Sequence, residues 1–197
     1  MPNWREAVYK IVGDESELNE LKAILDDIKD KLIIENDFGS LWLGNLINKL
    51  GGDYNKCDCR GEIVDYDLTD GVLTIYQQTA WCEQEDVRYA IAERFPSLSI
   101  YFLEEEPGLD VYYTNDEYRE YFPYRWKLSV QHYDNNGDID VDTIQYLTTL
   151  DVVSRCIKDY LNIDVRPDYG EIVDALNKYN DENDTHCCLN EFEYVEQ

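Results

Sequence analysis

The N-terminal half of the sequence alternates between strand-like and helix-like hydrophobic patterns. Residues 5–13 follow a two-residue alternation that predicts a strand. Asp14 is a helix-capping residue type, and the apolar positions behind it recur every three or four residues, which predicts a helix over 15–34. The apolar stripe of this helix consists of Leu18, Leu21, Leu25, Ile28 and Leu32. A second, shorter helix that buries Trp42 is expected before Gly51.

The clearest local signal is a pair of alternating runs around Asp70-Gly71. An Asp-Gly pair supplies the positive backbone angles of a tight hairpin turn, so residues 62–68 and 72–79 are expected to pair as antiparallel strands. Apolar side chains at helical spacing follow, and Pro96 ends that helix. A further alternating run is expected to form the next strand.

In order, the main elements are a strand, a helix, two strands, a helix and a strand. This βαββαβ order is typical of the ferredoxin-like fold, an α+β arrangement in which helices cover one face of an antiparallel sheet. The name describes a topology and implies no iron or sulfur. We assign residues 1–120 to this domain, with a turn at Pro107-Gly108 that leads to one more strand beside the fourth.

Residues 121–197 show a second hairpin pattern followed by two amphipathic helices. Two alternating runs flank a turn at Asn135, Asn136 and Gly137. Thr149 is placed to cap one helix, and Pro167 is placed to open the other. A last strand is expected near the C-terminus. We therefore expect a C-terminal ββααβ extension that packs on the same sheet.

The chain is strongly acidic, because 43 acidic residues against 17 basic residues give a formal charge of −26. A negative surface repels phosphate backbones and anionic lipids, which argues against direct binding to nucleic acid or to membranes. The hydrophobic fraction of 44% is that of a folded protein. No secretory or membrane-spanning segment is visible, so a cytoplasmic location is expected. The simplest role of the charge is solubility.

Six cysteines are spread over the chain, and we expect reduced thiols because no secretory signal accompanies them. Cys57, Cys59, His186 and Cys187 are of the types that bind zinc, but their C-x-C spacing is shorter than that of structural zinc sites. The sequence contains no C-x2-C pair, and Cys188 directly follows Cys187. We therefore expect no zinc site, and the role of these thiols stays open.

A ladder of aspartates in the second hairpin invites comparison with a calcium-binding loop. Its members include Asp138, Asp140 and Asp142. The comparison fails, because Ile139 stands where the loop needs glycine and Gln145 stands where it needs a bidentate glutamate. A hairpin with outward acidic residues explains the alternation, so we expect no metal ion or cofactor. The three aspartates are kept as candidate binding residues for a partner.

Three glutamates, Glu104, Glu105 and Glu106, precede the Pro-Gly turn. Together with Trp81 and Asp110 they are expected near one end of the sheet, where strands of the ferredoxin-like arrangement finish. Clustered carboxylates can bind a divalent cation or raise one another's pKa. We prefer the simpler interpretation of a solvated hairpin end, because runs of charge are usually exposed.

No catalytic motif is found in the sequence. It contains no G-x-S-x-G, no phosphate-binding glycine loop and no H-E-x-x-H. With two histidines, several Cys/His pairs can be drawn and nothing selects among them. We therefore expect no catalysis, and an enzyme that uses the carboxylates near Trp81 is an alternative.

Four short motifs follow one another in the first part of the chain: MPNW at 1–4, TAW at 79–81, FP at 95–96 and EPG at 106–108. In this order and spacing, residues 1–116 resemble the Api-ninety-two-like family of phage and conjugative-element proteins of unknown function. The chain departs from the family pattern where Arg5 follows MPNW in place of a cysteine, and where CEQ follows TAW in place of Ser and Pro. The resemblance implies a ferredoxin-like N-terminal domain and a mobile-element context, without catalytic residues.

These observations favour a non-catalytic protein-binding or accessory protein of a bacterial mobile element. Its expected partner is another protein, and the charge favours a basic one. The alternative is an acidic decoy that occupies the basic groove of a nucleic-acid-binding host enzyme. Such a decoy would use Glu104, Glu105, Glu106, Asp110 and the aspartate ladder.

Overall fold

The computed structural model describes residues 3–30, 38–133, 139–183 and 185–196. The chain forms two compact units, residues 1–116 and residues 117–195. The sequence predicts this boundary after residue 120. Each unit combines helices with antiparallel strands, so the α+β class is confirmed.

The first unit is built on an antiparallel sheet in which the strand order is β2-β3-β1-β4-β5. The two strands of the predicted Asp70-Gly71 hairpin and the strand predicted before the Pro-Gly turn are present. The strands are β1 (Trp4–Val12), β2 (Gly61–Thr69), β3 (Val72–Ala80), β4 (Ser99–Glu106) and β5 (Val111–Thr114).

The hairpin between β2 and β3 confirms the prediction from Asp70-Gly71. Both turn residues have positive φ angles, 53° at Asp70 and 77° at Gly71, as a two-residue turn that matches strand twist requires. The register runs from Thr69 opposite Val72 to Gly61 opposite Thr79. A β-bulge interrupts it between Ile63 and Asp65.

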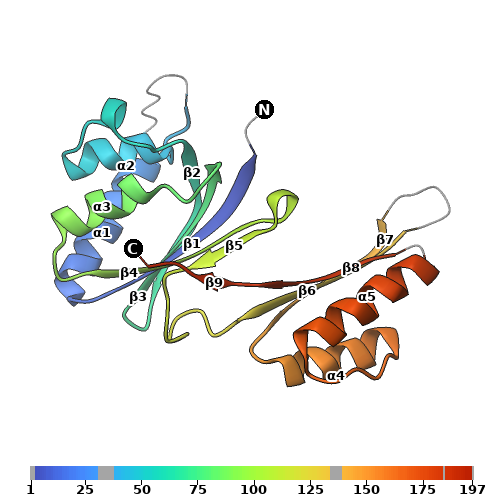
Figure 1. Cartoon of the computed structure of the whole chain (residues 1–197). Helices are drawn as coiled ribbons and strands as arrows, with labels where there is room; N and C mark the ends of the chain where they lie inside the picture. Colours follow the sequence, from blue (N-terminus) through green and yellow to red (C-terminus); the bar gives the residue numbers. More distant parts are fainter. Residues whose placement is uncertain (1–2, 31–37, 134–138, 184, 197) are drawn as a thin grey trace. The chain divides into compact units, whose positions relative to one another are not determined.

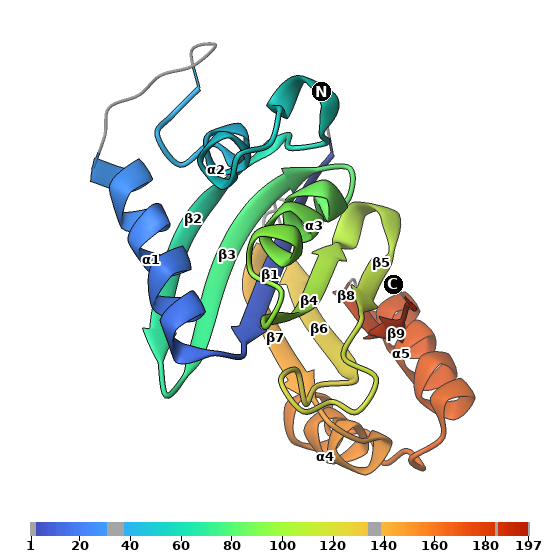
Figure 2. The same cartoon turned by 90° about the vertical axis from the view of Figure 1, so that its left-hand side faces the viewer.

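Three helices cover one face of this sheet (Figures 1 and 2). They are α1 (Glu15–Asp30), α2 (Leu43–Leu50) and α3 (Glu85–Arg94), with short 3-10 turns at η1 (Tyr54–Lys56) and η2 (Pro107–Leu109). The expected caps are present: Asp14 Oδ1 accepts hydrogen bonds from the backbone N–H groups of Ser16 and Glu17, and Gly51 ends α2 with a φ of 94°. The last part of the predicted first helix, residues 31–34, lies outside the described residues.

The strands divide their side chains between the helix-covered face and the face opposite the helices. On β1, Ala7, Tyr9 and Ile11 are buried toward the helices, whereas Glu6 is exposed and Val8 half-buried on the opposite face. This period of two follows from the pleat of a strand. The helix-covered face of β1 is therefore mostly buried and apolar, whereas the opposite face is partly exposed to solvent.

The second unit has a three-stranded antiparallel sheet of its own, in the order β7-β6-β8. Its strands are β6 (Trp126–Tyr133), β7 (Ile139–Leu147) and β8 (Thr185–Glu191), its helices are α4 (Leu150–Leu161) and α5 (Tyr169–Asn183), and β9 (Glu193–Tyr194) is a short last strand. The expected pairing of β6 with β7 is confirmed, and the turn predicted between them at 135–137 lies outside the described residues. Thr149 caps α4 through its Oγ1 atom, and α5 begins after Asp168, which accepts a hydrogen bond from the Glu171 N–H.

Strands β6, β7 and β8 pair with one another and are not hydrogen-bonded to the strands of the first sheet. The strand β6 lies between β7 and β8, and α4 and α5 pack on one side of the three strands (Figure 1). The result is a separate hydrophobic core. Its buried members include Leu128, Val130, Leu147, Val153, Ile157, Ile172, Leu176 and Leu189. Among the helices described, none combines the length and the apolar character needed to cross a membrane.

Replacing Gly71 with alanine should lower the free energy of unfolding by about 1 kcal/mol, because the left-handed backbone is costly for a residue with a Cβ atom. Gly39→Ala is the matched control, since a Cβ atom there meets nothing within 4 Å. Urea denaturation followed by circular dichroism measures both. Equal losses in the two variants would contradict the assignment of the turn.

Candidate functional site

The three glutamates of β4 are buried, so their interpretation as a solvated hairpin end was wrong. Glu104, Glu105 and Glu106 expose only 5%, 6% and 7% of their surface. They lie on β4, which is paired on both sides, with β1 and with β5. A carboxylate in such a place needs a cation or hydrogen-bond donors close by.

Glu104 finds these partners on the helix-covered face. Its Oε2 atom lies 3.0 Å from Nη1 of Arg5, and the same oxygen accepts a hydrogen bond of 2.6 Å from the backbone N–H of Glu83. Arg5 is itself 9% exposed. The ion pair therefore joins β1 to β4 and holds the segment that leads from β3 into α3.

Glu83 forms a second buried ion pair above the sheet. Its Oε1 atom accepts hydrogen bonds from Nε and Nη2 of Arg88, at 3.1 and 2.8 Å, and its Oε2 atom accepts one of 2.6 Å from the hydroxyl of Tyr9. The Arg88 guanidinium also lies 5.1 Å from the centre of the Phe102 ring. Burial raises the pKa of Glu83, and burial together with the Glu83 charge raises the pKa of Tyr9 well above its ordinary value.

We call Arg5, Tyr9, Glu83, Arg88 and Glu104 the buried ion network. Most of its charged atoms are directed at one another, which is the arrangement by which buried charges are made tolerable in a protein interior. Both of its carboxylates are buried, with Glu83 3% and Glu104 5% exposed. Sequence reasoning identified Glu104 but missed the two arginines, whose only signal was their position among apolar residues.

The other predicted site residues differ from Glu104 in their surroundings. Asp110 is exposed and ends η2 with a φ of 57°. Asp142 is exposed on β7 in the second unit, Asp138 lies outside the described residues, and the side chain of Asp140 is likewise not described. Glu106 is buried at the end of β4, and its Oε2 atom has no hydrogen-bond partner among the described residues.

Trp81, in contrast, lies on the surface directly after β3. It is 53% exposed, it has a φ of 69°, and its N–H donates a 3.0 Å hydrogen bond to the carbonyl of Asn3. The Arg60 guanidinium lies 4.8 Å from the centre of the Trp81 ring, a cation–π distance. No acidic side chain forms an ion pair with Arg60 in the described part of the chain.

Arg60 also lines a hollow of about 260 Å³ at the end of the sheet. We call this hollow the aromatic groove. It is lined by Trp4, Phe38, Gly39, Trp42, Arg60, Gly61 and Glu62. Trp4 and Phe38 are 53% and 49% exposed, and the Phe38 ring stacks on Trp42 with a centroid distance of 4.9 Å.

Hydrogen bonds to backbone groups hold the walls of the aromatic groove. The Ile63 N–H donates to the carbonyl of Leu41 at 2.9 Å, which ties the segment before α2 to β2. The Asn45 amide donates to the carbonyls of Gly39 and Ser40. A Cβ atom on Gly44 would lie 2.3 Å from the Trp42 ring, so glycine is needed for the ring to lie over α2. Trp42 was correctly predicted as core, at 8% exposed, whereas Phe38 and Arg60 were missed.

The thiols of Cys57, Cys59 and Cys82 are not activated. Burial is the main cause that raises the pKa of Cys57, Cys59 and Cys82, that of Cys59 to about 11. Thiols with a raised pKa are poor nucleophiles at neutral pH. Cys57 and Cys59 belong to the first unit and Cys187 to the second, and no three His, Cys, Asp or Glu side chains of the described residues gather as a metal site.

Comparison with known proteins adds little to this geometry. No family model and no curated protein matches the chain. A crystal structure of an unknown protein from Galdieria sulphuraria is similar over 96% of this chain and 98% of that chain, at 10% identity and a TM-score of 0.27. A likeness at that level supports no argument. The function has to be inferred from the site itself.

Replacing Arg88 with methionine should cost about 3–5 kcal/mol of unfolding free energy, because Glu83 would stay buried without its cation. Arg94→Met is the control: its ion pair with Glu20 is half exposed, and its loss should cost less than about 1 kcal/mol. Denaturant titration distinguishes the two. Similar costs would show that the buried ion network does not carry the stability assigned to it.

Tyr9→Phe should change the pH dependence of stability. The pKa of Tyr9 is higher in the folded than in the unfolded chain, so the wild type loses up to ~1.4 kcal/mol per pH unit from this group as the pH rises above the unfolded value of about 10. The variant lacks this loss, and its stability relative to wild type should rise between pH 9 and 11. Tyr118→Phe, at a ring that is 83% exposed, is the control. A parallel decline of wild type and Tyr9→Phe would refute the expectation.

Proposed function

We propose that this chain is a non-catalytic protein-binding protein and that the aromatic groove is its binding site. The observation that carries the proposal is the exposure of Trp4 and Phe38 beside Trp42 and an arginine free of any ion pair among the described residues. Tryptophan and arginine dominate the energetics of protein interfaces, because they combine a large apolar area with a polar or charged group. Large aromatic side chains are also costly to leave in water without such a role.

The rigidity of the groove supports the proposal. Trp42 is fixed by its stacking with Phe38 and by an edge contact to Tyr54 at 5.2 Å, and Arg60 is held over Trp81. A site that is already ordered loses little conformational entropy when it binds. The buried ion network is consistent with a non-catalytic role, because its two carboxylates are buried and paired with arginines.

The topology supports a ferredoxin-like first unit. The antiparallel order β2-β3-β1-β4, with α1 and α3 on the same face, is the order that this fold prescribes, and α2 and β5 are additions to it. The place in a bacterial mobile element and the cytoplasmic location rest on the family resemblance and on the sequence, and belong to the same proposal.

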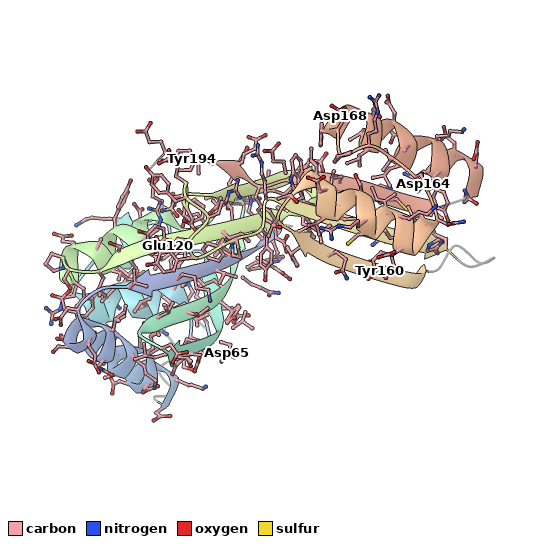
Figure 3. All side chains as sticks on the ribbon, turned by 90° about the horizontal axis from the view of Figure 1, so that it is seen from below. Asp65, Glu120, Tyr160, Asp164, Asp168 and Tyr194 are labelled. Atoms are coloured by element: carbon pink, nitrogen blue, oxygen red, sulfur yellow. The ribbon has the colours of Figure 1, made fainter. Side chains whose placement is uncertain are left out.

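The acidic-decoy alternative has less support. Glu104, Glu105 and Glu106 are buried and cannot imitate phosphates on a surface. Exposed carboxylates occur in both units, for example Asp65 in the first and Asp164 in the second (Figure 3). Charge spread in this way serves solubility and attracts basic partners in general.

The groove can be tested with a random peptide library displayed on phage and selected on the wild-type protein. Selected peptides should bind Trp4→Ala at least tenfold more weakly, because loss of a tryptophan anchor typically removes ~2 kcal/mol or more. Tyr160→Ala, at a ring that is 48% exposed in the second unit, should bind them normally. Circular dichroism checks that each variant is folded. Peptides that bind Trp4→Ala as tightly as wild type, or a selection that yields none, would contradict the proposal.

A further inference from the structure

A second hollow of about 360 Å³ lies on the first sheet, on the face opposite the helices. We call it the acidic hollow. It is lined by Glu6, Ala7, Val8, Val64, Asp65, Tyr76, Gln77 and Gln78. Val64 and Tyr76 are 57% and 44% exposed, so the hollow combines accessible apolar surface with carboxylates.

The acidic hollow adjoins the aromatic groove along the strands. Glu62 lines the groove, its register partner Gln78 lines the hollow, and Gln78 is in turn opposite Glu6. Trp4 in the groove and Val8 in the hollow are four residues apart on β1. At about 3.3 Å per residue this separation is about 13 Å.

The carboxylates of this face are not neutralised. Glu6, Glu62 and Asp65 are exposed, and none of them forms an ion pair with a basic residue of the described chain. The amino group of Lys10, on the same face, donates instead to Thr74 Oγ1 at 3.2 Å. Other carboxylates of the first unit do have a basic partner, as Asp26 has Lys22 and Asp27 has Lys49.

The β-bulge between Ile63 and Asp65 shapes the hollow. An extra residue in one strand changes the direction of the side chains around it. Here it leaves Val64 outward, and Asp65 accepts a hydrogen bond from the Tyr66 N–H at 2.9 Å, which orients its carboxylate. Asp65 lies at the outer edge of the first unit, on β2 (Figure 3).

We propose that the two hollows together bind one extended peptide segment of a partner protein. An apolar anchor, an aromatic residue or proline, fills the aromatic groove, and a lysine or arginine about four residues away enters the acidic hollow. The inference rests on the proposed function of the groove and adds the chemistry and the spacing of its ligand. Charge complementarity favours this occupant over a second copy of the chain, which carries the same charge of −26.

Fluorescein-labelled glycine/serine peptides with a single tryptophan provide the test, read by fluorescence anisotropy. One probe has no lysine, one has lysine next to the tryptophan, and two have lysine four residues before or after it. One of the spaced probes should bind wild type about three- to fivefold more tightly than the adjacent-lysine probe, the gain of one exposed ion pair. The adjacent probe has the same charge and so controls for general attraction to an acidic protein.

Matched variants separate the two hollows. Glu6→Gln/Asp65→Asn should abolish the advantage of the spaced probe, whereas Glu93→Gln/Asp142→Asn, which removes two exposed carboxylates elsewhere, should retain it. An advantage that is absent, or that survives Glu6→Gln/Asp65→Asn, overturns the assignment of the acidic hollow. The lysine-free probe tests the groove alone: if it does not bind wild type, or binds Trp4→Ala equally well, the proposed function falls, and this inference falls with it.

Discussion

The buried ion network is the constraint on which the first unit depends. Two carboxylates and two guanidinium groups lie between the sheet and α3, and each must be matched because an unmatched charge is expensive to bury. The match fixes the segment between β3 and α3, since the Glu83 N–H is bonded to Glu104 and the Glu83 side chain to Arg88 and Tyr9. The surface site is built on that fixed segment.

The link from the network to the surface runs through Gln84. Its side-chain oxygen accepts a hydrogen bond of 2.7 Å from the Arg60 N–H, and its amide donates to the carbonyls of Ala80 and Cys82. These bonds place Arg60 and Trp81 next to each other, with the guanidinium over the ring. The aromatic groove therefore owes one of its walls to polar contacts inside the protein.

Most local structure could be predicted from the sequence because its determinants are local. The Asp70-Gly71 turn, the Asp14 and Thr149 caps and the stop at Gly51 each depend on a few neighbouring residues, and each is found. Contacts between distant residues could not be predicted in this way. Arg5 is 99 residues from Glu104, and without knowing of that pair a run of glutamates looks like exposed surface. The same limit applies to β8, whose pairing with β6 gives the second unit its own sheet, and to Phe38 and Arg60, which only the fold brings to one groove.

The bulge in β2 also affects the free edge of the first sheet. Near Ile63 this edge is occupied by the segment with Leu41 and Trp42, and beyond the bulge it carries Asp65 and Asp67. A regular, apolar edge strand can pair with the edge of another molecule and start aggregation. The start of β2 is already hydrogen-bonded, its register is irregular and it carries negative charges. Each of these features opposes pairing with another molecule, so β2 can remain an edge strand without promoting aggregation.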